Sequence, residues 1–233
     1  MNYRSPFSAR LRIKLQLASG SEEATIALLS KQNAPSWFRA YLLLTHSIIR
    51  SSVPLMCAAY DNCIDSQEDA DLVARLRKYY KKHIQEEMHH DEWILDDLES
   101  IGESRLDSLS QKPSQKVAEL VGSQYYWIYH WHPVCLLGHI SFLEGNPPKK
   151  ELIYRLQEIT GYPDTAFRTL IKHSDLDRHH RDELDKLLEE LPLTTRHEQW
   201  ITSNALYSAY KLSETWDELT NTINIKTKAN SRN

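Results

Sequence analysis

The sequence contains little glycine and proline and only three cysteines, and each shortage narrows the class of protein. There are 6 glycines and 9 prolines among 233 residues, too few for a long β architecture with many turns. The cysteines, Cys57, Cys63 and Cys135, are odd in number and sparse, so a disulfide framework is not expected. A reducing cytoplasm is therefore the expected location.

The sequence also lacks the patterns that indicate a membrane or a nucleic-acid partner. No run approaches the roughly 18 consecutive apolar residues of a membrane span. The basic amino terminus, MNYRSPFSARLRIKLQL, has neither the apolar region nor the cleavage site of a signal peptide. The net charge of −4 gives no electrostatic reason to expect nucleic-acid binding.

Helical periodicity dominates what remains, and no alternating apolar run predicts a strand. We expect an all-α protein with one helical domain over residues 19–222, because no repeat or change of composition marks a second domain. Residues 1–18 are predicted to be a loosely ordered arm and residues 223–233 a flexible tail. The expected helices are 19–32, 35–65 divided or kinked at Pro54, 67–101, 115–144 interrupted near Pro133, 149–161, 163–193 as two helices meeting near Asp177, and 194–221.

Residues 81–102, KKHIQEEMHHDEWILDDLESIG, combine a helical pattern with three histidines and seven carboxylates. Positions i, i+4 and i+7 share one helix face. The face that begins at Leu76 reads Leu76, Tyr80, His83, Glu87, His90, Ile94 and Ile101. Burying unpaired charges costs several kcal/mol, and a bound metal removes that cost. Glu87 and His90 also form the Glu-x-x-His pair of carboxylate-bridged di-iron bundles, although a salt-bridged surface helix is the alternative.

A second segment, HWHPVCLLGHISFLEGNPP, ends a nearly uncharged helix with Glu144. The helix dipole disfavours a carboxylate at this end, so Glu144 is a candidate metal ligand, with an exposed terminal glutamate as the alternative. His130, His132 and His139 in the same segment are interpreted as hydrogen-bonded groups rather than ligands.

The third segment, LIKHSDLDRHHRDEL, places His173, Asp177 and His180 at i, i+4 and i+7. Two imidazoles and one carboxylate are the ligand set of non-haem Fe(II) sites that activate oxygen. The alternative is that Asp177 caps a helix beginning near Arg178 and that the histidines lie on the surface.

Apolar residues flank these candidate ligands along their helices and predict an enclosed apolar pocket: Leu55, Met56, Tyr80, Ile94, Leu137 and Phe142. The aromatic residues of the fourth long helix are interpreted first as core packing: Tyr125, Tyr126, Trp127 and Trp131.

The segments HIQEEMHHDEWILDDLESIG, HPVCLLGHISFLEGNPP and HSDLDRHHRDELDKLLEELPLT, in this order, resemble the heme-oxygenase-like di-iron oxidases and oxygenases, also described as iron-containing redox enzymes. The resemblance covers roughly residues 50–205, and His-x3-Asp-x2-His at 173–180 is its strongest motif. It implies a bundle of about seven helices that is shared with thiaminase II. The sequence departs from the family at His83, where relatives carry a carboxylate, and in residues 36–63, which contain no glutamate.

The resemblance implies two Fe(II) ions per chain, bound among His83, Glu87, His90, Glu144, His173, Asp177 and His180, with Glu87 and Glu144 also acting in catalysis. The expected reaction is oxidation of a small organic substrate by O2, namely N-oxygenation, desaturation or carbon–carbon cleavage of an amino-acid-like or fatty-acid-like molecule. A homodimer is compatible with the sequence.

Two alternatives stay open. The chain could be a cysteine hydrolase similar to thiaminase II, because Cys135 follows a proline within a helical segment, as in those enzymes. It could also be a non-catalytic metal-binding or partner protein that keeps the fold.

Overall fold

The structure is a computed structural model that describes residues 5–18, 26, 29–64, 69–145 and 147–230, with side chains described as far as residue 221. Every regular element in these ranges is a helix, which confirms the all-α class. The α-helices are α1 (Phe7–Ala18), α3 (Ala34–Ile49), α4 (Ser52–Asp61), α5 (Ala70–Glu87), α6 (His90–Ser100), α7 (Arg105–Ser110), α8 (Gln115–His130), α9 (Leu136–Leu143), α10 (Lys150–Thr160), α11 (Arg168–Glu190) and α12 (Thr195–Asn230). Two short 3-10 helices, η1 (Pro133–Cys135) and η2 (Asp164–Phe167), precede α9 and α11.

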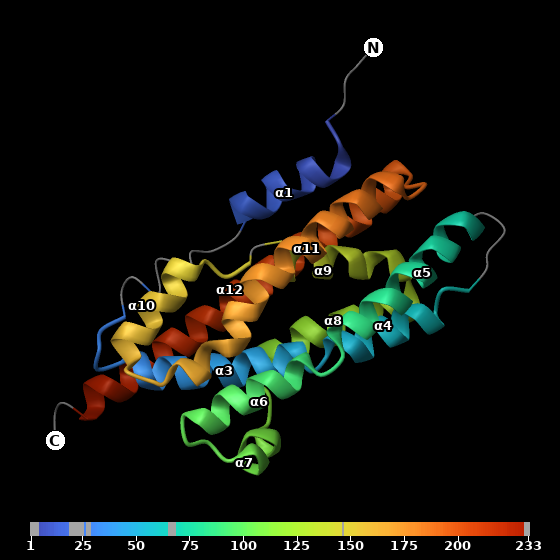
Figure 1. The fold of residues 1–233 in the computed structure, drawn as a ribbon. Coiled ribbons are helices and arrows are strands. Elements are labelled where there is room, and N and C mark those ends of the chain that lie inside the picture. The colour runs from blue at the N-terminus through green and yellow to red at the C-terminus, as the bar shows by residue number, and fades with distance from the viewer. Residues whose placement is uncertain (1–4, 19–25, 27–28, 65–68, 146, 231–233) are drawn as a thin grey trace.

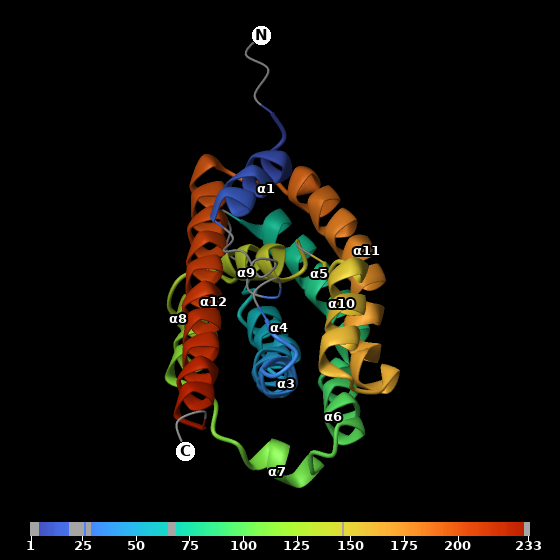
Figure 2. The same ribbon diagram turned by 90° about the vertical axis from the view of Figure 1, so that its left-hand side faces the viewer.

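Helices α3 and α4 form the centre of the bundle, and the longer helices pack around them (Figure 1). Seen end on, α8 and α12 lie on one side of this centre, and α6, α10 and α11 lie on the other (Figure 2). Two large clusters of buried apolar side chains fill the bundle, one containing Tyr80 of α5 and the other Ile94 of α6. The polar face His83–Glu87–His90 therefore lies where one apolar cluster gives way to the other.

The prolines divide the chain as expected. The helix predicted over 35–65 breaks at Arg50 and Ser51, so that Pro54 falls in the first turn of α4. N–H groups in the first turn make no hydrogen bond within the helix, so the lack of an N–H in proline costs nothing there. Pro133 separates α8 from α9 in the same way. Ala34–Asp61 is the one stretch of the described chain that is long and apolar enough to cross a membrane by length and composition. In the bundle this stretch forms the two central helices.

The expectation of one helix over 67–101 is wrong, because the chain breaks between α5 and α6. Met88 has an extended backbone, and His89 has φ 70°, in the left-handed region. Left-handed geometry is uncommon for a residue other than glycine, and it concentrates near functional sites. The break sets α6 at a new angle and separates Glu87, the last residue of α5, from His90, the first residue of α6.

The expectation of a loosely ordered amino-terminal arm is wrong for residues 7–18. These residues form α1, which buries Phe7, Leu11 and Leu15 against the bundle. The basic residues of the arm pair with acids of the neighbouring helices: Arg10 with Glu198 at 2.6 Å and Arg12 with Asp185 at 2.6 Å. The arm therefore holds the ends of α11 and α12.

The structure describes only part of the two ends of the predicted domain. Most of the helix predicted over 19–32 lies outside the described residues. At the other end, α12 continues to Asn230, so the backbone expected to be a flexible tail from residue 223 is helical up to that residue.

Gly138 is required where α9 crosses α12. A Cβ at this position would lie 2.8 Å from the backbone nitrogen of Ala205 and still closer to the carbonyl oxygen of Ile201. The absence of a side chain therefore lets the two helix backbones touch. This contact fixes α9, which carries Glu144 at its carboxyl end.

Asp97 joins α6 to the start of α11. Its Oδ2 accepts a hydrogen bond from the N–H of Thr169 at 3.0 Å, and Thr169 lies in the first turn of α11, whose N–H groups have no partner within the helix. Burial raises the pKa of Asp97 to about 6. Asp97 thus links the helix of His90 to the helix of His173.

We expect Asp97→Ala to lower the free energy of unfolding by about 2 kcal/mol, because it leaves a buried donor without a partner. Urea denaturation at pH 7.5, where Asp97 is ionised, measures the loss. Asp96→Ala is the matched control. Asp96 is half-exposed and pairs with Arg105, so we expect a loss below about 0.5 kcal/mol. Equal losses in the two variants would contradict the role of Asp97.

Candidate metal centre

The seven candidate ligands come from four helices that converge between the two apolar clusters. Helix α5 supplies His83 and Glu87, and α6 supplies His90. Glu144 follows directly after α9. The remaining three, His173, Asp177 and His180, lie along α11. Six of the seven side chains fall into two groups in which one ligand atom from each residue lies within 4.8 Å of the others.

The first ligand group consists of His83, Glu87, Glu144 and His180. His83 Nε2 lies 2.7 Å from Glu144 Oε1, and His180 Nδ1 lies 3.5 Å from Glu87 Oε1. Both histidines are buried. Burial lowers the pKa of His83, but the hydrogen bond and charge of Glu144 outweigh it and raise this pKa to about 9. The metal-free group therefore holds a proton where a cation would sit.

The second ligand group consists of Glu87, His90 and His173. His90 Nδ1 lies 3.1 Å from Glu87 Oε2, and the rings of His90 and His173 meet edge to face at 5.1 Å. Burial lowers the pKa of His173, so this imidazole is neutral and able to ligate. Glu87 faces the first group with one oxygen and the second with the other, which is the arrangement of a carboxylate that bridges two metals.

Three buried atoms of these groups have no hydrogen-bond partner: His90 Nδ1, His180 Nδ1 and Glu144 Oε2. The two imidazole nitrogens lie close to Glu87 but are not directed at it as donors. Buried polar atoms without partners are costly, and in a native protein they call for an explanation. Two cations, one per ligand group, would satisfy the nitrogens, so the residues present fit a binuclear metal site.

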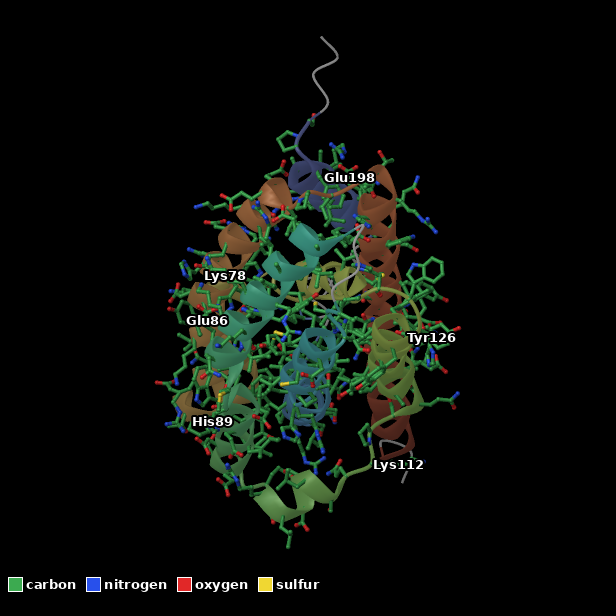
Figure 3. The ribbon with its side chains drawn as sticks, turned by 90° about the vertical axis from the view of Figure 1, so that its right-hand side faces the viewer. Lys78, Glu86, His89, Lys112, Tyr126 and Glu198 are labelled. Carbon is green, nitrogen blue, oxygen red and sulfur yellow. The ribbon has the colours of Figure 1, made fainter. Side chains whose placement is uncertain are left out.

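Hydrogen bonds behind the ligands fix the imidazole rings. His173 Nδ1 bonds the carbonyl oxygen of Thr169 at 2.9 Å, which leaves Nε2 free to bind a metal. His83 Nδ1 lies 3.3 Å from Glu86 Oε2, and Glu86 in turn pairs with Lys82 at 2.9 Å. Figure 3 shows Glu86 toward the outside of the bundle, so the chain His83–Glu86–Lys82 runs from the site to the surface.

Asp177 belongs to neither ligand group, although it is buried beside them. Burial raises the pKa of Asp177 to about 8, and the charges of Glu144 and Glu87 add to this effect. The alternative in which Asp177 caps a helix is wrong, and so is the expected division of this segment. Helix α11 is continuous from Arg168 to Glu190, and Asp177 lies in its middle.

His139 and His132 are hydrogen-bonded, as interpreted from the sequence, whereas His130 differs from that interpretation. His139 is buried, its Nδ1 pairs with Ser208 Oγ at 2.9 Å, and burial lowers its pKa to about 4. His132 Nδ1 accepts a hydrogen bond from the N–H of Val134 and caps η1. His130 is exposed at the end of α8.

A cavity of about 20 Å³ adjoins the first ligand group, with His83, Glu87 and Glu144 in its wall. The rest of its lining is mostly apolar and includes Leu55 and Met56, as the sequence predicted. Tyr80, Ile94, Leu137 and Phe142 do not line this cavity and are buried in the apolar clusters. A space of this size holds one or two atoms rather than an organic substrate.

Of the four aromatic residues expected to pack in the core, only Tyr125 lies against an apolar cluster. Tyr126, Trp127 and Trp131 are exposed, and Figure 3 shows Tyr126 on the outside of the bundle. Trp127 and Trp131 line a second cavity of about 120 Å³, whose other walls include Trp200 and Cys135. The apolar surroundings raise the pKa of the Cys135 thiol to about 12, so it is not ionised at neutral pH.

Three groups that contact the ligand histidines were not predicted from the sequence as partners of these ligands: the side chain of Tyr79, the carboxylate of Glu86 and the carbonyl of Thr169. The helical spacings of Glu86 and Thr169, three and four residues from the histidines they contact, were visible in the sequence. Tyr79 lies one helical turn before His83, and the two rings stack at 5.2 Å. Its proximity to Glu144 depends on tertiary packing and has no signal in the sequence.

Comparison with solved structures identifies the fold. Solved structures similar to this chain include a domain of unknown function with a heme oxygenase-like fold from Shewanella denitrificans, at 18% identity and a TM-score of 0.77, covering 94% of this chain and 91% of that one. A TenA homolog from Pseudomonas syringae pv. tomato is similar at 12% identity and a TM-score of 0.66, covering 91% of this chain and 92% of that one. These likenesses establish the heme-oxygenase-like fold. A comparison with curated proteins found no match.

The family described as iron-containing redox enzymes matches residues 73–210, a span that includes all seven candidate ligands. This span is more than half of the chain. The protein therefore belongs to the iron-containing redox enzyme family, with a heme-oxygenase-like fold.

Proposed function

We propose that this protein is a non-haem di-iron oxidase or oxygenase that uses Fe(II) and O2 to oxidise a small organic molecule. The observation that carries the proposal is the position of Glu87, which offers one carboxylate oxygen to each of two ligand groups. A single metal in one group would leave the other oxygen of Glu87 facing the histidine of the second group. A structural salt-bridge network would be expected to give the nearby imidazole nitrogens hydrogen-bond partners, which they lack.

In this proposal, His83, Glu87, Glu144 and His180 hold one iron, and Glu87, His90 and His173 hold the other. Asp177 is a further buried carboxylate near Glu144, Glu87 and His83 of the first group. Bound iron supplies the redox chemistry that lets O2 react with an organic molecule. The chain fixes the imidazole rings through Thr169 and Glu86, and Leu55 and Met56 keep the adjoining cavity apolar.

The apolar lining favours an aliphatic or aromatic substrate, such as a fatty acid or the side chain of an amino acid, over a sugar or a nucleotide. The outcomes proposed are N-oxygenation, desaturation or carbon–carbon cleavage. The small volume beside Glu144 suits O2 or one water molecule, so a substrate would take its place only after side chains move.

A cysteine hydrolase similar to thiaminase II is the second candidate, and the fold likeness to a TenA homolog favours it. The state of Cys135 argues against it, because the thiol is buried and its raised pKa disfavours the thiolate. This candidate also gives no reason for the two ligand groups.

We expect the protein to bind about two irons per chain when loaded anaerobically with Fe(II), and His173→Ala or His180→Ala to reduce this to about one. Each of these histidines belongs to only one ligand group. Elemental analysis after removal of free metal measures the content, and Cys135→Ser is the control that should retain both irons. Well under one iron per folded chain would refute the proposal.

Oxygen uptake by the Fe(II)-loaded protein then separates an enzyme from a protein that binds metal without catalysis. We would add amino acids and fatty acids in turn and compare the rates of uptake. Faster uptake with one class identifies the substrate class. Iron binding without substrate-dependent uptake by any class would favour the non-catalytic reading.

A further inference from the structure

The phenolic hydroxyl of Tyr79 is a buried hydrogen-bond donor without an acceptor, and nearby Glu144 has a buried carboxylate oxygen without a donor. Neither Tyr79 Oη nor Glu144 Oε2 has a hydrogen-bond partner. Both residues contact His83: the Tyr79 ring stacks on the imidazole at 5.2 Å with 17° between the planes, and Glu144 Oε1 lies 2.7 Å from His83 Nε2. Tyr79 and Glu144 therefore meet at one imidazole.

The charge distribution agrees with this proximity. Burial raises the pKa of Tyr79 well above its ordinary value, and after burial the largest contribution is the charge of Glu144. The phenol therefore keeps its proton and is available as a donor. Desolvated hydroxyl groups without a partner are unusual, because each has lost its hydrogen bonds to water without replacing them.

Metal binding would remove one hydrogen-bond donor from Glu144. In the metal-free chain, His83 Nε2 and Glu144 Oε1 share a proton. A histidine binds a metal only through a deprotonated nitrogen, so Glu144 loses this hydrogen-bond donor when His83 ligates through Nε2. The described chain has four buried hydroxyl groups without a partner, those of Tyr79, Ser108, Ser141 and Thr169. Of these residues, Tyr79 is the one whose ring stacks on His83, the imidazole that bonds Glu144.

We infer that Tyr79 is a positioning residue that donates its phenolic hydrogen to Glu144 and thereby orients this carboxylate toward the metal. The inference rests on the proposed function, because it assigns Tyr79 a role only in the metal-loaded site. Groups that hold metal ligands in this way commonly change metal affinity 10- to 100-fold when they are removed.

Tyr80 provides a matched control one residue away. Its hydroxyl is buried like that of Tyr79, but it donates to the carbonyl oxygen of Pro133 at 2.9 Å. Tyr79→Phe and Tyr80→Phe therefore remove the same atom from neighbouring buried positions. Only the first removes a hydroxyl from a residue whose ring stacks on a candidate metal ligand.

The test is a titration of metal-free wild type, Tyr79→Phe and Tyr80→Phe with Co(II), followed by visible absorption. We expect Tyr79→Phe to bind about tenfold more weakly and to shift the Co(II) bands, and Tyr80→Phe to match wild type in both. Thermal unfolding of the metal-free proteins gives a second readout. Tyr79→Phe should be at least as stable as wild type, and Tyr80→Phe less stable, because only Tyr80 loses a hydrogen bond.

The outcomes separate this inference from the proposed function. If wild type binds no Co(II), the metal site itself fails and the role of Tyr79 fails with it. If wild type binds and Tyr79→Phe shows the same affinity and the same bands, the metal site stands and the inference is overturned. Equal weakening by both variants would also overturn it, since packing alone would then explain the effect.

Discussion

Glu87→Ala is expected to abolish binding of both irons, whereas the loss of a histidine ligand removes only one. Glu87 places Oε2 3.1 Å from His90 Nδ1 and Oε1 3.5 Å from His180 Nδ1, and these histidines belong to different ligand groups. The substitution therefore removes one ligand and one negative charge from both sites. We expect each affinity to fall on the order of 100-fold or more, because even indirect partners of a metal change affinity 10- to 100-fold.

Glu86→Ala is the matched control for this experiment. Glu86 is the preceding residue, carries the same charge and contacts His83, but faces outward and pairs with Lys82. We expect it to weaken only the first site, by about tenfold. Anaerobic Fe(II) binding, followed by elemental analysis across a range of free Fe(II), distinguishes the two patterns. Retention of one tightly bound iron by Glu87→Ala would show that this carboxylate does not bridge.

The second large effect concerns pH, and it appears in the metal-free protein. We expect the free energy of unfolding to fall steadily between pH 7.5 and pH 9. Two buried groups hold protons in this range: His83, with a pKa of about 9, and Asp177, with a pKa of about 8. Both pKa values are raised above those of the unfolded chain, for which the ordinary values are 6.5 and 3.8.

The sign follows from the protons bound in each state. Stability falls with pH wherever the folded state binds more protons than the unfolded state. The stabilising contribution of His83 is complete below pH 6.5 and is lost as pH rises toward 9. For Asp177, stability is lost as pH rises from about 4 to about 8. Five histidines have lowered pKa values and act in the opposite direction near pH 6.5, where the unfolded chain still binds protons at these positions: His46, His132, His139, His173 and His197. Above about pH 7.5 they are neutral in both states and no longer affect the slope.

Asp177→Asn isolates one part of this slope. Removing the ionisable group should stabilise the metal-free protein at pH 8 and flatten its pH dependence. The pKa of Asp177 rises from 3.8 to about 8 on folding. One pKa unit corresponds to about 1.4 kcal/mol, so half of this rise corresponds to about 3 kcal/mol in the free energy of unfolding. Urea denaturation at several pH values is the measurement. The same variant should bind Fe(II) more weakly, because the cation loses a neighbouring carboxylate. A slope that Asp177→Asn leaves unchanged would contradict the assignment.

The sequence predicted the helical class because it follows from local spacing. His173 and His180 are seven residues apart, so two helix turns bring them to one face of α11. The sequence did not predict that these two histidines belong to different ligand groups, because that division depends on the packing of α5, α6 and α9 against α11. The prolines at 54 and 133 marked helix boundaries for the same local reason.

The parts that the sequence could not predict depend on packing between distant segments. The left-handed residue His89 has no glycine to signal it, so residues 67–101 read as one helix. Helix α1 was taken for a loose arm because its acidic partners, Glu198 and Asp185, are far away in the chain. Trp127 and Trp131 lie in an apolar sequence and were assigned to the core, although their face of α8 is open to solvent.

The contact at Gly138 has a consequence for how a substrate could enter. The backbones of α9 and α12 already touch there, so these two helices cannot move closer together to enlarge the cavity beside Glu144. Close-packed backbones cannot yield as side chains can. The opposite wall is built differently, because α5 and α6 meet at Met88 and His89 without a continuous helical hydrogen-bond ladder. If a substrate entered between α5 and α6, it would move Glu87 away from His90. The backbone torsions of Met88 and His89 would then control both the entry of substrate and the geometry of the metal ligands.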